Sequence, residues 1–285
     1  MSGVTYYETS APINPFMDSS IPIDMSAAEA EHGTIHKALI SAGVEVLKVK
    51  PPIHCQDGVY TANWALVRGD LAVLSRLPGA RTAEEEYAQT VLCELGKKVY
   101  RVPNELRFSG QGDALPCGRY LFCGSVYRSD SEAQAFVAKT LGYIRIQLQT
   151  IPLLNSRGEH VLNSSSGWPD SYFYDIDLAL SVLRFPSNNQ KGLIAWCPEA
   201  FMPESRKVLE QLNVVDKIAV SIEEAQNAFA CNLVSTGKTV IMTRHAPIFR
   251  KELIARGFRV VMPDITELSK GGGYIRCTTL TLDNE

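Results

Sequence analysis

The sequence predicts an α/β protein, a five-bladed β/α propeller built from ββαβ modules with pseudo-fivefold symmetry. The first observation is a recurring unit in which a helical pattern, a glycine and a run rich in Val and Ile follow one another. Glycine is favoured where a helix ends in the left-handed conformation, and β-branched residues favour strands. The second is a pair of short apolar runs before each later helix. The third is length, since five modules of about 57 residues account for all 285 residues.

Each expected element follows from this unit in chain order. Helical patterns predict helices over 83–95, 131–141, 203–212 and 247–256. Strands are expected after the glycines, or after Asn213 in their place, over 44–49, 97–102, 143–148, 214–220 and 258–262. Strand pairs joined by turn residues are expected at 59–67 with 71–75, at 230–235 with 239–243, and on both sides of 117–119 and of 186–191.

Two segments fall outside the repeated unit. The polar stretch from about 154 to 170 reads as a loop insertion in a single domain that spans 1–285. The run Tyr274–Leu282 reads as a spare strand that joins the N-terminal module and closes the ring, which leaves few open edges. The alternative from repetition alone is a simple α/β sheet with irregular insertions.

Composition excludes several classes of function. The chain is 45% hydrophobic and 21% charged with a net charge of −3, so we expect a globular protein with no nucleic-acid partner. No apolar run approaches the roughly 20 residues that a membrane helix needs. The first residues lack the features of a signal peptide, and seven scattered cysteines do not suggest a disulfide framework. We therefore expect a reduced, cytoplasmic protein, with a homodimer as one possible state.

Cys277 is the candidate nucleophile in the C-terminal segment. It follows three consecutive glycines, which let the backbone approach a neighbouring group closely. Cys93 lies in a helical pattern, and Cys123 and Cys231 lie in strand-like runs, where cysteine is commonly a small apolar residue. The chain has no C-x-x-C pair and no ligand-spaced histidine cluster, so neither a metal nor another cofactor is expected.

Carboxylates and arginines at strand ends are candidates for binding a charged ligand. Asp175 and Asp177 are two apart, so a strand would place them on the same face, where they are either solvated or opposite a cation. Arg76 and Arg128 end comparable runs in successive modules and are either surface charges or a clamp for a substrate carboxylate.

Taken together, the motifs resemble those of the guanidine-modifying penteins, a superfamily of dimethylargininases, arginine deiminases, arginine dihydrolases and amidinotransferases. The likeness covers almost the whole chain, at 14–20, 57–63, 112–115, 198–201 and 271–277. It implies a five-bladed propeller with an active site on its axis and Cys277 as the nucleophile. The implied substrate is a small guanidino compound, bound without a cofactor by Asn14, Asp57, Asn63, Arg76, Asp113 and Arg128.

The resemblance also implies a reaction. A thiolate attacks the guanidinium carbon, an amine leaves, and the covalent thiouronium intermediate passes to water or to an acceptor amine. Asp177 is expected to hold the cation, and Asp175 stands where the family has the histidine of an H-x-D motif. Ser109 stands where many members have a glutamate, and Asn63 matches the dihydrolase-like subset.

Three functions stay open on this basis. The leading hypothesis is a Cys-dependent hydrolase of a guanidino or amidino carbon. A catalytically silent protein that binds a cationic metabolite or a protein partner is the second, and an amidinotransferase is the third. If Asp175 does not carry the proton, His160 from the inserted loop is the alternative.

Overall fold

A computed structural model describes residues 1–284, in which one ββαβ arrangement occurs four times. Each sheet has three strands, the first two antiparallel and the second and third parallel. The sheets are β1 (Ala65–Arg68), β2 (Leu71–Leu74) and β3 (Lys98–Arg101); β4 (Ala114–Cys117), β5 (Tyr120–Cys123) and β6 (Ile144–Gln147); β7 (Leu180–Arg184), β8 (Gly192–Trp196) and β9 (Val215–Ala219); and β10 (Val234–Ser235), β11 (Thr239–Ile241) and β12 (Arg259–Val261).

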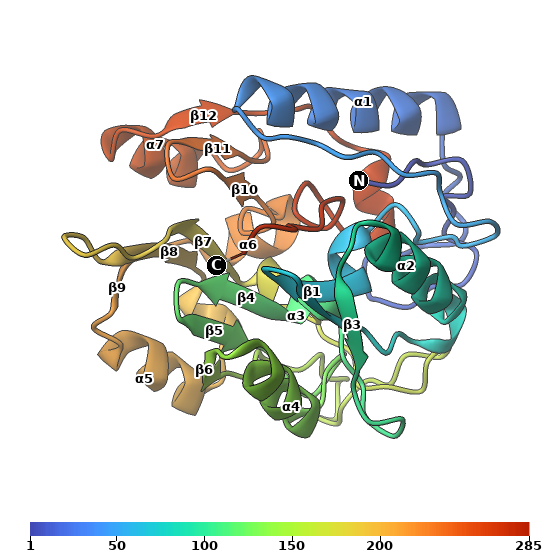
Figure 1. Cartoon of the computed structure of the whole chain (residues 1–285), viewed down its shortest axis with the longest axis horizontal. Coiled ribbons are helices and arrows are strands. Elements are labelled where there is room, and N and C mark those ends of the chain that lie inside the picture. Colours follow the sequence, from blue (N-terminus) through green and yellow to red (C-terminus); the bar gives the residue numbers. More distant parts are fainter. Residues whose placement is uncertain (285) are drawn as a thin grey trace.

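One helix connects the second and third strands of each sheet, as a parallel pair requires. All four expected helices are confirmed, each ending within one residue of its predicted end. They are α2 (Ala83–Glu94), α4 (Ser131–Leu141), α5 (Pro203–Gln211) and α7 (Pro247–Ala255). Figure 1 shows these helices and α1 (Met25–Ser41) around the periphery, with the short helices α3 (Gly110–Asp113) and α6 (Ile222–Ala228) nearer the middle.

The N-terminal unit is less regular than the other four, and the strand expected over 44–49 is wrong. Among the described residues this unit has α1 and one parallel bridge between Ser2 and Val49. No hairpin strand lies beside the 44–49 run, so its backbone lacks the ladder that would make it a strand. The ββαβ module is thus seen four times, and the closed ring of five blades stays a prediction.

The C-terminal strand expected over 274–282 is also wrong, since this segment is a series of turns. The hydroxyls of Thr278 and Thr279 donate to the carbonyls of Ile275 and Arg276 at 2.8 and 2.9 Å. Such local bonds compete with a strand ladder. The segment still contacts the module that contains β1, because Ala62 N donates to Cys277 O at 3.0 Å.

Two further boundaries differ from the predictions. Only 65–67 of the expected strand 59–67 belongs to a strand, β1, because Thr61–Trp64 forms a buried 3-10 helix. The Oγ1 of Thr61 donates to Thr278 O and so ties this helix to the C-terminal segment. Only Val234–Ser235 of the run 230–235 is a strand.

The strand expected to place Asp175 and Asp177 on one face is wrong. Asp177 lies in a 3-10 helix, Ile176–Leu178, with Asp175 at its N-cap, so strand alternation does not apply to this pair.

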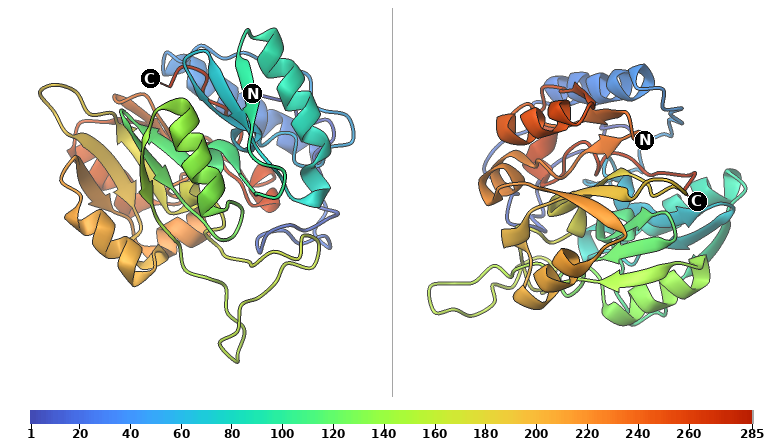
Figure 2. Two further views of the ribbon diagram at one scale, coloured as in Figure 1. Left: turned by 60° about the horizontal axis from the view of Figure 1, so that its bottom comes forward. Right: turned by 90° about the vertical axis from the view of Figure 1, so that its left-hand side faces the viewer.

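The segment 154–170 projects from the molecule as a hairpin, drawn in yellow-green in Figure 2. Bridges between Leu154 and His160 and between Leu162 and Pro169 hold it together. His160 is exposed on this hairpin. This placement gives the alternative proton carrier no contact with Cys277.

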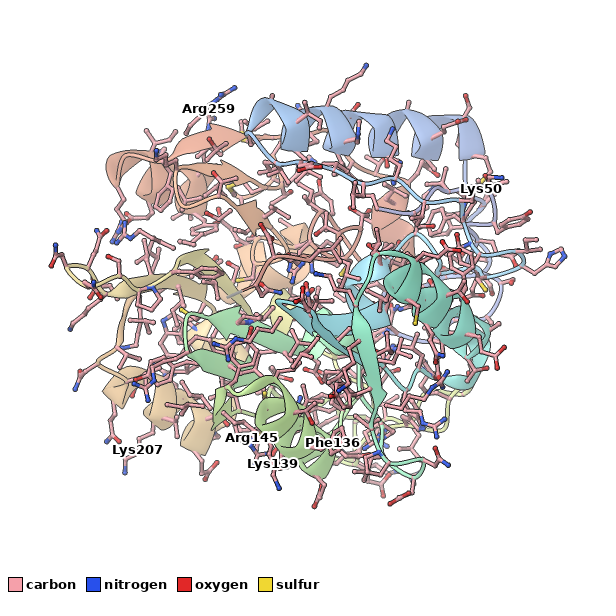
Figure 3. The ribbon with its side chains drawn as sticks, viewed as in Figure 1. Lys50, Phe136, Lys139, Arg145, Lys207 and Arg259 are labelled. Atoms are coloured by element: carbon pink, nitrogen blue, oxygen red, sulfur yellow. The ribbon has the colours of Figure 1, made fainter. Side chains whose placement is uncertain are left out.

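Four of the basic side chains labelled in Figure 3 lie toward the periphery on separate elements, and the fifth, Arg145, is half-buried on β6. Lys50, Lys139, Lys207 and Arg259 are all exposed and are spread over the N-terminal unit, α4, α5 and β12. Within residues 1–284, no helix has the length and apolar character needed to cross a bilayer.

Candidate active site

Cys277 is buried, with 2% of its surface exposed, and its position is fixed by the side chain of Asn232. Asn232 Oδ1 accepts from Cys277 N at 3.1 Å, and Asn232 Nδ2 donates to Cys277 Sγ at 3.2 Å. One amide therefore orients both the backbone and the thiol. The sequence analysis missed Asn232, because only its spatial proximity to Cys277 distinguishes it from any other asparagine.

The three glycines before Cys277 allow the close approach that the sequence predicted. A Cβ on Gly271 would lie 2.2 Å from Tyr60 Oη, and one on Gly273 would lie 2.8 Å from Cys277 Cβ. Gly272 has a φ of +84° and would clash with Asn14 Oδ1. Asn14 in turn donates to Gly271 O at 2.9 Å, so the predicted site residue Asn14 holds this loop beside the thiol.

A small cavity, here called the front cavity, lies against Cys277. Its walls come from the N-terminal segment, from residues within and on both sides of the 3-10 helix 61–64, and from the glycine loop. The lining residues are Ile13, Asn14, Asp57, Tyr60, Asn63, Arg81, Arg128, Tyr174, Gly271, Gly273 and Cys277. Four predicted site residues therefore meet Cys277 here, namely Asn14, Asp57, Asn63 and Arg128.

Three carboxyl groups are buried around the thiol. Asp177 Oδ2 lies 3.7 Å from Cys277 Sγ, and Asp113 Oδ1 accepts from Ile176 N at 3.1 Å. Asp113, Asp175 and Asp177 each keep one oxygen that is buried and has no partner among the described residues. Such oxygens are costly unless they are protonated or meet a donor.

The pKa values in this cluster move in one direction. Burial raises the pKa of Asp177 well above its ordinary value, and the charge of Asp175 raises it further. The pKa of Asp113 is raised by the same two causes. Burial, followed by the carboxylates of Asp177 and Asp175, raises the pKa of the Cys277 thiol. Burial therefore disfavours the charged forms of Asp113, Asp177 and Cys277, and a bound cation would favour them.

Asp175 lies one hydrogen bond behind the front cavity. Its Oδ2 accepts from Asn63 Nδ2 at 2.7 Å, and Asn63 also donates to Ser109 Oγ at 2.9 Å. Burial raises the pKa of Asp175, opposed mainly by the positive charge of Arg128. Gly112 makes this packing possible, since a Cβ there would lie 2.5 Å from Asp175 Oδ2.

The arginines separate into different roles. Arg128 lines the front cavity, stacks 4.6 Å from the ring centre of Tyr174 and donates to Ile13 O. Arg76 does not line it, because its guanidinium points to the exposed Asn104 and the buried Glu85. The sequence analysis missed Arg81, which is buried, pairs with Glu84 at 2.8 Å and donates to Asn63 Oδ1 at 2.9 Å.

Asp57 also lines the front cavity and precedes the 3-10 helix 61–64 that contains Asn63. Its Oδ2 accepts from Gln56 Nε2 at 2.8 Å. Burial raises the pKa of Asp57 to about 6, opposed by the nearby Arg81. The cavity thus presents a carboxyl, an arginine and a thiol to one small ligand.

Comparison with known proteins identifies the family to which this arrangement belongs. No family model matches the chain. It is 31% identical over 285 residues to a dimethylarginine dimethylaminohydrolase from Mycobacterium tuberculosis, a match that covers 99% of this chain and 84% of the relative. The chain belongs to the guanidine-modifying pentein superfamily.

Arginine dihydrolases are similar to the chain at nearly the same level of sequence identity. The chain is 30% identical over 279 residues to the bifunctional arginine dihydrolase/ornithine cyclodeaminase AgrE from a Nostoc species, covering 96% of this chain but 36% of that longer protein. The N-terminal domain of ArgZ, an arginine dihydrolase from cyanobacteria solved as a mutant bound to substrate, superposes with a TM-score of 0.85 at 29% identity. That match covers 100% of this chain and 97% of the domain.

Two further solved penteins carry ligands. An ArgZ variant covalently bound to a reaction intermediate matches with a TM-score of 0.85 at 29% identity, over 99% of this chain and 97% of that one. A dimethylarginine dimethylaminohydrolase adduct with S-methyl-L-thiocitrulline matches with a TM-score of 0.71 at 18% identity, over 97% of this chain and 96% of that one. The second likeness shows a shared fold.

Proposed function

We propose that this pentein is a hydrolase that attacks the guanidino or amidino carbon of a small arginine-like compound with Cys277. The buried cluster of Asp113, Asp175, Asp177 and the thiol carries this proposal. Burial raises the pKa of all four acidic groups, and a bound guanidinium would favour their ionised forms through its charge and its several N–H donors.

The substrate itself then activates the nucleophile. When the guanidinium enters beside Asp177, its charge favours the ionised forms of the carboxyl and of the thiol 3.7 Å away. The protons of the carboxyl and of the thiol pass to solvent as the substrate binds, so the thiolate is favoured only when there is a carbon to attack.

The reaction proceeds in two steps that share one thiouronium intermediate. In the first, the S–C bond forms, the C–N bond breaks, and the leaving amine takes a proton from the Asp175 carboxyl. In the second, water adds to the carbon, gives a proton back to Asp175, and the S–C bond breaks to release a ureido product and the thiolate. Asp177 holds the cationic carbon group throughout.

Arg128 is expected to bind the carboxylate of the substrate. Replacing it by alanine removes a charge-assisted hydrogen bond at the cavity wall, so KM for a substrate with a carboxylate should rise about 10- to 100-fold. Arg76→Ala is the matched control, because Arg76 lies outside the cavity, and KM should stay within about twofold of the wild type. Steady-state kinetics with arginine and with agmatine, which lacks the carboxylate, measures both. An equal loss on both substrates would contradict this role.

Asp177→Asn is expected to stabilise the free protein while it removes binding. The folded-state pKa of Asp177 lies above the ordinary value of 3.8, so ionisation opposes folding once the pH rises through that ordinary value. The variant's melting temperature should exceed that of the wild type by a few degrees at pH 8 and match it near pH 4. Differential scanning calorimetry at both pH values tests this expectation, and a variant that is less stable at pH 8 contradicts it.

A protein that binds a cationic metabolite without turnover is the second candidate, and one observation favours it. Asp175 and Ser109 stand where the resemblance places a histidine and a glutamate, and no histidine lines the front cavity among the described residues. A thermal-shift screen with arginine, its methylated forms and agmatine, run with product assays, separates the two. Stabilisation without product identifies the binder, and product with any compound identifies the hydrolase.

A further inference from the structure

A second, larger cavity is lined by Asp177, which does not line the front cavity. We call it the rear cavity; its walls come from β4, β7, β10 and the C-terminal segment. It is lined by Asp177, Ser181, Phe185, Cys231, Leu233 and Arg276, among others. The two cavities have no lining residue in common.

Asp177 links the rear cavity to the nucleophile. It lines the rear cavity, and its Oδ2 lies 3.7 Å from the Sγ of Cys277, which lines the front cavity. Arg276 gives a second link between the rear cavity and the nucleophile. It lines the rear cavity, and the next residue in the chain is Cys277. The rear cavity therefore ends one carboxyl group away from the reacting sulfur.

The walls of the rear cavity suit small polar molecules that move through it. At its inner end, Asp177 Oδ1 and Ser181 Oγ are buried and have no partner among residues 1–284. Arg276 donates to Gln111 Oε1 at 2.8 Å and to Thr279 O at 3.2 Å. At its outer end Phe185 is 46% exposed, so the cavity begins at the molecular surface.

The proposed reaction needs such a second route, and the inference rests on that reaction. While the intermediate is attached to Cys277, its carboxylate end lies near Arg128 and its chain fills the small front cavity. The leaving amine must depart and a water must arrive while the front is occupied. If the front cavity were the only route, the tightly bound substrate chain would block it and slow both the departure of the amine and the arrival of water.

We propose that the rear cavity carries the leaving amine out and the hydrolytic water in, past Asp177. The amine departs as ammonia or a small methylated amine, with the proton it received when its C–N bond broke. Water enters by the same path, adds to the thiouronium carbon and loses its proton to the acidic cluster, and the S–C bond breaks. The route restricts the leaving group to a small amine, whatever the rest of the substrate.

The test compares a filled and an open rear cavity at one position. Ser181→Leu fills the inner end, and Ser181→Ala leaves it open without the hydroxyl. After rapid acid quenching, intact-protein mass gives the fraction of covalent intermediate during turnover of arginine. We expect Ser181→Leu to lower the steady-state rate about tenfold or more and to raise the intermediate fraction, and Ser181→Ala to stay within about twofold of the wild type.

A second filled variant guards against misfolding at the buried position. Val182 also lines the rear cavity but is half-buried, so Val182→Phe narrows it with less strain on the core, and Val182→Ala is its control. Melting temperatures accompany all four variants. The same accumulation of intermediate is expected for Val182→Phe, and a folded variant without it contradicts the proposal.

An independent measurement needs no turnover. In a Cys277→Ser background, Ser181→Cys places a thiol at the inner end of the rear cavity. Methyl methanethiosulfonate, a small thiol-modifying reagent, tests whether small molecules reach this thiol. We expect one more modified thiol than in the Cys277→Ser parent, counted by mass. A thiol at position 181 that stays unmodified in the folded protein overturns the route.

Different results would contradict the proposed hydrolase activity and the proposed rear-cavity route. If the wild type turns over no guanidino compound, the proposed hydrolase is wrong and this inference falls with it. If the wild type turns over and the filled variants match their alanine controls in rate and in intermediate fraction, the rear route alone is wrong.

Discussion

Replacing Cys277 by serine is expected to lower kcat by at least about a thousandfold on any substrate that the wild type turns over. A serine hydroxyl does not ionise in the range that a bound guanidinium makes accessible to a thiol, and no general base stands beside it except the carboxyls of its own cluster. The fold should be unaffected, because both residues fit the pocket that Asn232 holds. Steady-state assays and melting temperatures measure the two parts.

Cys93→Ser is the matched control for this experiment. Cys93 is exposed on α2 and lines neither cavity, so the same chemical change there should leave kcat unaltered. Residual activity in Cys277→Ser above a few per cent of the wild type would remove the thiol from the mechanism.

Replacing Asp175 by alanine is expected to cost about a hundredfold in kcat, the usual size of a lost proton carrier. Asp175→His should lose less, because an imidazole can still give and take the proton. The pKa of Asp175 is raised by burial, so the carboxyl is the proton donor only below that pKa. In the wild type, kcat should therefore fall as pH rises through the raised value, and in Asp175→His this decline should move.

Asp177 is the other carboxyl that could carry this proton, and its contacts differ from those of Asp175. Asp177 touches the thiol directly, whereas Asp175 reaches the cavity through Asn63. Full activity in Asp175→Ala, or an unchanged pH decline in both Asp175 variants, would end the role given to Asp175 and assign the proton to Asp177.

Much of the module architecture could be predicted from sequence because its signals are local. A helix such as α4 ends at Gly142, which has a φ of +73°, and the strand after it is rich in isoleucine. The wrong strands lack such support. The segments 44–49 and 274–282 have the composition of strands, but whether they form a ladder depends on partners that the sequence does not reveal.

The site was predicted in part, and its errors have one physical origin. Motifs pointed to Cys277, Asp57, Asn63 and Arg128, and these residues line one cavity. Arg76 and Arg81 are five residues apart, and only the fold shows that Arg81 turns inward to Glu84 while Arg76 stays at the surface.

The measurement that tests the central claim most directly is the intact mass of the wild-type protein quenched in acid during incubation with arginine and its methylated forms. The account predicts a mass increase equal to the substrate minus its leaving amine, located on the peptide that contains Cys277 and missing in Cys277→Ser. A protein that these compounds stabilise against heat, but that forms neither this adduct nor any product, would contradict it.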